Sequence, residues 1–266
     1  MCARLAFAND VNVLTAATVR SAFASLLLLG LLRARGTPVV PLPQQFKSTL
    51  VLGLLIAAQT VLIQAAVALL PVTLAILVFF TYPFLTGVVI SLRGEERFTP
   101  QLAATLAAAF VGLALVLGVG AERVSLLGVA AALGAAVSFS AVLVLTPRLA
   151  PGIGAPLRTF FMLATAAVIL VAAALATHEF RLPMSAAGWS GLAGLSIFYA
   201  AGIIGLFLVL PLLGAIRTVV VLNLEPVAVA LVAWLALGES LAPAQGIGAA
   251  IVVTAVMFYQ LRGRRA

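Results

Sequence analysis

Two stretches of the chain share one pattern: TYPFLTGVVISLRGEERFTPQ at residues 81–101 and NLEPVAVALVAWLALGESLAPAQ at residues 223–245. Each is an apolar run with a proline near its start, followed by a Gly-Glu turn and then a second proline. An offset of 143 residues aligns the two stretches without a gap. The aligned positions are Tyr82-Pro83 with Glu225-Pro226, Glu96 with Glu239, and Pro100 with Pro243. The agreement across two apolar runs and a turn predicts an internal repeat.

The composition around these stretches indicates that most of the chain lies in lipid. Of the 266 residues, 64% are hydrophobic and only 8% are charged, which is too little polar surface to cover a water-soluble globule. The formal net charge is +8, but the basic residues stand singly or in short groups between long apolar runs, unlike the basic patch of a nucleic-acid-binding protein. We therefore expect an all-α integral membrane protein that lies in a lipid bilayer and does not bind nucleic acid.

Several chemistries are excluded by residue counts. Cys2 is the only cysteine and His178 the only histidine, so an intramolecular disulfide, a Cys/His metal set and a catalytic triad cannot form. The chain also contains no G-x-x-x-x-G-K-[ST] phosphate loop, which argues against direct use of ATP. We expect no enzyme activity, no metal and no bound cofactor.

Nine segments are long and apolar enough to cross a bilayer core of about 30 Å. They run approximately over residues 15–32, 48–70, 72–92, 102–119, 125–146, 157–176, 189–212, 216–237 and 241–260. The short connections between them leave no room for a soluble domain.

The distribution of basic residues between alternate loops predicts the orientation, because Lys and Arg near the ends of spans stay on the cytoplasmic side. Eleven of the 15 lie on one side, which also holds the C-terminal tail with Arg262, Arg264 and Arg265. We therefore expect a multi-pass protein of the inner or plasma membrane with a cytoplasmic C-terminus. The first Gly-Glu turn lies among arginines and the second does not, so the two turns are expected on opposite membrane faces. Such an inverted-topology repeat is the architecture of many secondary transporters.

The paired Pro-apolar-Gly-Glu-x-x-x-Pro pattern, with Asn223-Leu224-Glu225-Pro226 in the second copy, resembles the EamA-type branch of the drug/metabolite transporter superfamily over nearly the whole chain. The resemblance implies two five-helix inverted repeats, here residues 1–120 and 121–266, with a central substrate path and both termini in the cytoplasm. The chain departs from this pattern at its start, where only Arg4 to Ala8 correspond to the family's first helix. Nine spans place the N-terminus outside, and a further helix before residue 1 would move it inside.

Glu225 is the leading candidate for the substrate or ion path. It lies about nine residues into its span, close to the midplane, where an ionisable group is costly without a partner, water or a role. The functional interpretation is a proton or cation site, and the alternative is a neutral structural carboxyl. The adjacent Pro226 and its counterpart Pro83 remove backbone hydrogen bonds and should weaken both helices at the same depth.

Four other residues complete the set of path candidates. Asn223 lies two residues from Glu225 and is expected to bridge helices. Gln59 is favoured over Gln64, with an interhelical hydrogen bond as its alternative. Tyr82 and Tyr199 could line a cavity or simply fill the core. Arg20 is interpreted as a residue that snorkels to a nearby span end, with attraction of an anion as the alternative. Glu96 and Glu239 are interpreted as helix caps, and Gly128, Gly134, Gly202 and Gly205 as sites of close helix packing.

These features favour a secondary transporter that exports a small metabolite, amino acid or amphipathic compound by alternating access. Transport could be coupled to protons, and we expect no bound cofactor. The alternatives are a channel-like or scaffold membrane protein without coupling, and an inactive truncated transporter. The sequence does not identify the substrate. It also leaves the oligomeric state open, with a homodimer as one possibility.

Overall fold

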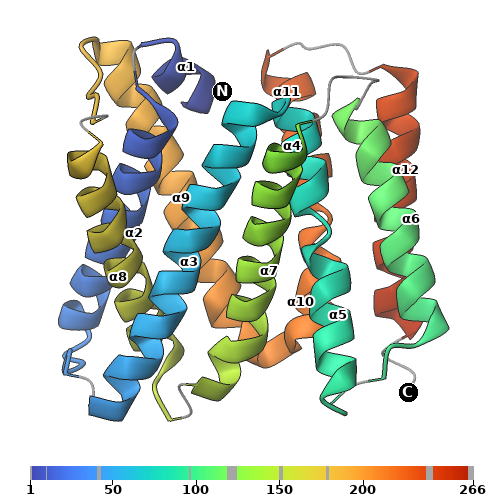
Figure 1. Ribbon diagram of the computed structural model, residues 1–266, viewed down its shortest axis with the longest axis horizontal. Coiled ribbons are helices and arrows are strands. Elements are labelled where there is room, and N and C mark those ends of the chain that lie inside the picture. The colour runs from blue at the N-terminus through green and yellow to red at the C-terminus, as the bar shows by residue number, and fades with distance from the viewer. Residues whose placement is uncertain are drawn as a thin grey trace. The chain divides into compact units, whose positions relative to one another are not determined.

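The computed structural model of the chain describes residues 2–9, 11–40, 43–95, 97–118, 125–149, 152–177, 180–237 and 242–262. These residues form helices and no strand (Figure 1). The helices are α1 (Cys2–Phe7), α2 (Val13–Ala34), α3 (Pro43–Leu69), α4 (Val72–Phe79), α5 (Tyr82–Leu92), α6 (Pro100–Leu117), α7 (Leu126–Leu149), α8 (Ala155–Ala176), α9 (Ala186–Leu213), α10 (Ala215–Leu222), α11 (Glu225–Leu237) and α12 (Pro243–Arg262).

Within these residues, nine helical segments are long and apolar enough to span a membrane. They coincide with the nine segments expected from the sequence, and the all-α membrane class is confirmed. Two of the nine spans are interrupted. One consists of α4 and α5, and the other of α10 and α11.

The helix boundaries recur at the offset of 143 residues that aligns the sequence with itself. The register carries α4 (72–79) onto α10 (215–222), and it carries α5 (82–92) onto the first eleven residues of α11. It likewise relates the starts of α2, α3 and α6 to those of α8, α9 and α12 within one residue. The short α1 falls on residues 145–150, where α7 ends. The division into two repeats near residue 120 stays a prediction, which this register supports.

The chain packs as two compact units, and each takes helices from both halves of the sequence. Unit 1 contains Met1–Gln64 and Leu145–Leu212, and unit 2 contains Ala65–Val144 and Leu213–Ala266. Unit 1 therefore holds α1, α2, α8 and most of α3 and α9. Unit 2 holds α4, α5, α6, α10, α11, α12 and most of α7.

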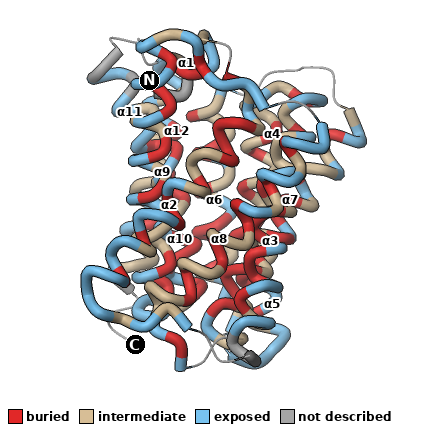
Figure 2. Tube along the Cα trace, turned by 90° about the vertical axis from the view of Figure 1, so that its left-hand side faces the viewer, coloured by how far each residue is buried: buried red, intermediate tan, exposed pale blue. Residues whose placement is uncertain are grey.

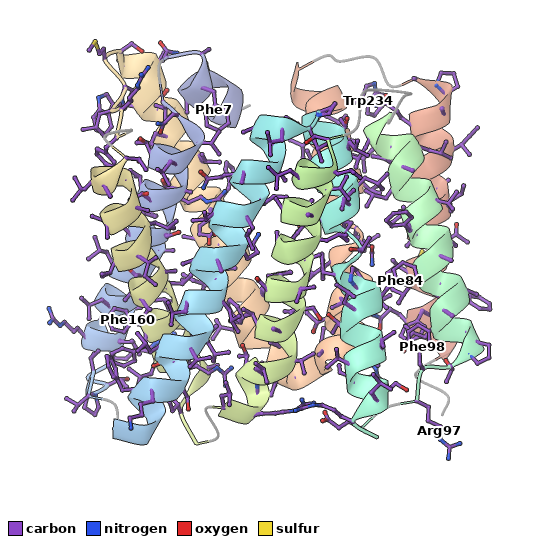
Figure 3. The ribbon with its side chains drawn as sticks, viewed as in Figure 1. Phe7, Phe84, Arg97, Phe98, Phe160 and Trp234 are labelled. Carbon is purple, nitrogen blue, oxygen red and sulfur yellow. The ribbon has the colours of Figure 1, made fainter. Side chains whose placement is uncertain are left out.

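In unit 1, α2 packs along α8, its counterpart in the repeat. The two helices run in opposite directions: Phe7, shortly before α2, lies at one end of the unit, whereas Phe160, near the start of α8, lies at the other (Figure 3). The helix α3 approaches α8 closely, since a Cβ added to Gly53 would lie 2.5 Å from Cβ of Thr165.

In unit 2, α6 packs along α12 in the same antiparallel manner. Phe98, just before α6, and Trp234, shortly before α12, mark opposite ends of the unit (Figure 3). One face of α6 is buried and the rest is more exposed. Buried and exposed residues alternate in this way along many of the helices, as the changing colours of the tubes show (Figure 2). The buried hydrophobic residues of the buried face of α6 are Leu102, Leu106, Ala109, Leu113 and Val116. Their spacing of three and four is that of one helical stripe.

Glycine packing only partly follows the expectation from sequence. A Cβ at Gly128 would lie 2.6 Å from Cγ of Leu70, as expected for a site of close approach. Among the described residues, in contrast, nothing lies within 4 Å of a Cβ added to Gly202 or Gly205, which contradicts their interpretation as packing sites. The tightest glycine contact of unit 2 joins Gly112 and Gly248, whose added Cβ atoms would lie 2.7 and 2.5 Å from each other's carbonyl oxygens.

Candidate substrate path

The two interrupted spans of unit 2 break at equivalent positions. The first helix ends at Phe79 and resumes at Tyr82, and the second ends at Leu222 and resumes at Glu225. Proline follows at the second position of α5 and of α11. Proline has no N–H, so it fits the first turn of the new helix but deprives the carbonyl four residues earlier of its usual donor. Each break thus exposes backbone polar groups inside an apolar span.

The two broken spans also meet, because α5 contacts α10. Each broken span therefore packs against the other, as expected for two spans that occupy equivalent positions in the repeat. Such discontinuous helices are where secondary transporters place substrate and ion sites, since free helix ends supply backbone dipoles to a ligand.

Tyr82 lies in an aromatic cluster at the first break. Its ring centroid is 4.9 Å from that of Phe139, 5.2 Å from that of Phe79 and 5.6 Å from that of Phe80. The side chain is 1% exposed, so its ring fills the core of unit 2. Its phenol is close enough to Glu225 for the two side chains to interact electrostatically. Tyr82 thereby connects the first break to the second.

One turn further along α5, Thr86 fixes the cluster to α7. Its hydroxyl forms hydrogen bonds to the carbonyl of Tyr82 (2.8 Å) and to the hydroxyl of Ser140 (3.0 Å), and both side chains are buried. Ser140 and Phe139 are neighbours on α7, so this helix contributes both a polar and an aromatic contact to the break. Sequence reasoning missed both residues because nothing in the sequence around them marks this pairing.

Glu225 is the first residue of α11 and is exposed. It lies ten residues after the start of α10, or about 15 Å along the helical rise. A carboxylate in the first turn of a helix is stabilised by the unpaired N–H groups and the positive end of the helix dipole. The structure thus presents an accessible carboxyl inside a span, at a position that favours negative charge.

Asn223 does not bridge helices in the way expected from the sequence. Its Nδ2 group donates to the carbonyl oxygens of Val219 (2.9 Å) and Val220 (3.4 Å), which belong to its own helix. The side chain is 3% exposed. It therefore closes the C-terminal end of α10, because the free carbonyls of a helix end need donors when they are buried.

The remaining two path candidates, Gln59 and Tyr199, lie in unit 1. Gln59 is half-buried and its Oε1 accepts a long 3.5 Å hydrogen bond from the hydroxyl of Thr60 on the same helix. Tyr199 is half-buried and supports the guanidinium of Arg20, whose Cζ lies 4.4 Å from the ring centroid. The structure therefore groups Tyr82, Asn223 and Glu225 in one unit, and Gln59 and Tyr199 in the other.

Arg20 is not a snorkelling residue. Tyr199 is the partner of its guanidinium and lies thirteen residues after the start of α9 and fourteen before its end, so the charge is held near the middle of that helix. The only feature of the sequence that pointed to the pair of Arg20 and Tyr199 was the presence of a charged residue, Arg20, inside a span. Glu96 and Glu239, interpreted as helix caps, lie outside the described residues. Among the described residues, no group of three or more His, Cys, Asp or Glu could hold a metal ion.

The fold and the breaks define a class: a polytopic α-helical membrane protein in which two discontinuous helices meet. Comparison with known families specifies the class further. The family model of the EamA-like transporter family matches residues 1–118 and 126–260, so the chain belongs to this family, as its motifs indicated. It is thus a member of a family of membrane transporters of the drug/metabolite transporter superfamily.

The other comparisons concern individual proteins. No curated protein matches the chain. One protein of known crystal structure superposes with a TM-score of 0.76 and is 20% identical in sequence, and the match covers 99% of this chain and 92% of that protein. At this identity the likeness shows the shared fold.

Proposed function

We propose that this chain is a secondary transporter that exports a small metabolite, amino acid or amphipathic compound by alternating access. Membership of a transporter family supports the general activity. The recurrence of helix boundaries at 143 residues supports a mechanism in which two equivalent sets of helices exchange conformations.

The accessible carboxyl of Glu225 is the observation that carries the proposal. A charged side chain facing lipid at mid-span costs about 2.5–3.5 kcal/mol or more, so such residues face water-filled cavities or the interior of a bundle. Glu225 is exposed and stands next to a helix break, where backbone groups also need a polar environment. We infer that this side of the break lines a hydrated path.

The same carboxyl would couple transport to protons. Glu225 would bind a proton in one state of the cycle and release it in another, while the packed ring of Tyr82 and the amide of Asn223, which closes α10, keep the break in position. The remaining components of the proposal are a lipid bilayer of the inner or plasma membrane, a cytoplasmic C-terminus and a homodimer. The charge distribution supports the orientation, and the nine apolar spans support the bilayer.

The test is flux of a pooled metabolite and drug panel in proteoliposomes, measured with an imposed pH gradient in either direction. Wild type should move at least one panel compound faster when the gradient is present. Glu225→Gln should lose the dependence on the gradient, whereas Glu95→Gln, which removes an exposed carboxyl at the end of α5, should keep it. Equal gradient-driven flux by Glu225→Gln and wild type would refute coupling through this residue.

A further inference from the structure

The contact between Arg20 and Tyr199 joins α2 to α9 inside unit 1. The guanidinium carbon lies 4.4 Å from the ring centroid of Tyr199, well within the range of a cation–π interaction. Such contact uses one face of the guanidinium plane. The N–H groups of an arginine point outward within that plane, so they stay available for hydrogen bonds.

The pair lies deep in its spans. Tyr199 is at the centre of α9, about 20 Å from the first residue of that helix by helical rise. Arg20 is the eighth residue of α2 and could have reached toward the near end of its helix, as long basic side chains usually do. Its contact with Tyr199 instead holds the charge at mid-span, where a cation needs an acceptor or water.

The described residues of unit 1 provide no counter-charge for Arg20. They include no Asp or Glu, and the two acids that the sequence has in this unit, Asp10 and Glu179, lie outside the described residues. Among the described residues the Nε of Arg20 is buried without a hydrogen-bond partner, and the whole side chain is half-buried rather than sealed. An aromatic face compensates an arginine less completely than an anion does.

We propose that Arg20, held on the ring of Tyr199, binds the carboxylate of the transported molecule. This inference rests on the proposed transport function and assigns a substrate class to it, a small monocarboxylate. A guanidinium offers parallel N–H groups that match the two oxygens of a carboxylate. Tyr199 fixes the plane of the fork in advance, which lowers the entropy cost of binding.

A monocarboxylate fits better than a phosphate because Arg20 supplies only one positive charge at this position. The other basic residues of unit 1 that the structure describes lie in α1, in the loops or near helix ends, as Arg33, Lys47 and Arg158 do. A dianion bound by Arg20 would keep an uncompensated negative charge at mid-span, whereas a carboxylate leaves the site neutral.

Ligand-dependent thermal stabilisation of the purified full chain tests the inference without requiring transport. The probes are two pairs of equal shape, benzoate with benzamide and hexanoate with hexanamide, and inorganic phosphate as a third anion. Wild type should be stabilised by at least one carboxylate and not by its amide or by phosphate. Arg20→Gln should weaken carboxylate binding by roughly tenfold or more, equivalent to about 1.4 kcal/mol, while Arg33→Gln, at the exposed end of the same helix, should bind like wild type.

Three further variants separate recognition from folding. Arg20→Lys keeps the charge but loses the fork and should bind more weakly than wild type. Tyr199→Phe keeps the aromatic face and should bind normally, whereas Tyr199→Leu should weaken binding although Arg20 is intact. If Arg20→Gln does not fold, the inference is tested by the difference in carboxylate binding between Tyr199→Phe and Tyr199→Leu.

Two results would overturn the inference: equal stabilisation of wild type by carboxylates and amides, or unchanged carboxylate preference in Arg20→Gln. Failure of the transport proposal is distinguishable. Carboxylate-specific binding without flux of any compound in proteoliposomes would support the carboxylate site and refute transport. Flux confined to neutral or cationic compounds would support transport and refute the carboxylate site.

Discussion

The first residues of α5 and α11 occupy equivalent positions in the repeat but differ in chemistry. Tyr82 is buried among aromatic rings, whereas Glu225 is exposed. A symmetric backbone thus carries an asymmetric pair, with a rigid phenol on one side and a titratable carboxyl on the other. This asymmetry supports a packing role for Tyr82 and the proposed role of Glu225 in the substrate path.

Tyr82 should separate these roles by mutation. Tyr82→Ala removes a ring packed against three phenylalanines and should cost about 3–5 kcal/mol of stability. Tyr82→Phe keeps the packing and should cost less than about 1.5 kcal/mol, with its main effect on the pH dependence of flux through Glu225. Thermal unfolding and proteoliposome flux measure the two effects. A large stability loss in Tyr82→Phe would contradict this division.

Asn223 should be sensitive to the identity of its amide. Its Nδ2 donates to two backbone carbonyls, so Asn223→Asp places a carboxylate oxygen against those oxygens, whereas Asn223→Ala only removes the bonds. We expect Asn223→Ala to lower stability by about 1–3 kcal/mol and Asn223→Asp to lower it further. Thermal unfolding compares the two, and equal loss in both would show that the carbonyls do not depend on the amide.

How far the sequence predicts the site depends on the distance between interacting residues. Glu225 and Pro226 are visible because charge and proline are rare inside spans. The contact of Arg20 with Tyr199 joins residues far apart in the chain, and its geometry follows from how α2 packs with α9. Asn223 was misinterpreted because its partners are the carbonyls freed at the end of its own helix, a break that the apolar pattern of residues 216–237 does not reveal.

At the scale of elements, close approach between α6 and α12 depends on two glycines. A methyl group at Gly112 or Gly248 would lie within 2.7 Å of the other's carbonyl oxygen, so the helices must move apart to accept it. We expect Gly112→Ala and Gly248→Ala each to cost about 1–3 kcal/mol, measured by thermal unfolding.

The matched control for these variants is Gly202→Ala. Gly202 is also helical, and an added Cβ there meets none of the described residues within 4 Å, so the change should be neutral or stabilising by about 0.5–1 kcal/mol through helix propensity. Equal destabilisation of all three would attribute the effect to glycine itself rather than to the contact between α6 and α12.

The connection between α9 and α10 tests backbone conformation rather than packing. Gly214 precedes α10 with φ of 76°, whereas Gly154 precedes α8 with φ of −55°. Only the first conformation is unfavourable for a residue with a Cβ, so Gly214→Ala should cost roughly 1–3 kcal/mol, and Gly154→Ala should cost little. The difference in melting temperature between the two variants measures this effect, and no difference would contradict it.

Element boundaries were more predictable than breaks. Long apolar runs fix the spans because a bilayer sets their length, and α8 begins and ends within two residues of the expected 157–176. The interruptions at residues 80–81 and 223–224 could be located only by their prolines, since the runs on either side are equally apolar.

At the scale of the whole molecule, the antiparallel packing of repeat partners follows from an inverted repeat. Helices related by a two-fold axis in the membrane plane must run in opposite directions, as α2 and α8 do in unit 1 and α6 and α12 do in unit 2. Each pair lies inside one unit, so the units form by exchange of helices between the two sequence halves. This explains why the compact units differ from the sequence repeats.

Inverted topology makes a direct prediction about sidedness. Arg97 and Ala242 are exposed residues just before α6 and α12, helices whose starts should lie on opposite membrane faces. In a Cys2→Ser background, which removes the only native cysteine, Ala242→Cys should react in intact cells with a membrane-impermeant maleimide, and Arg97→Cys should react only after permeabilisation. The positive-inside rule sets this direction, because the first loop is the one rich in arginine. Labelling of both cysteines from the same side would contradict the inverted repeat, and exchange of the two results would keep the repeat but reverse the orientation.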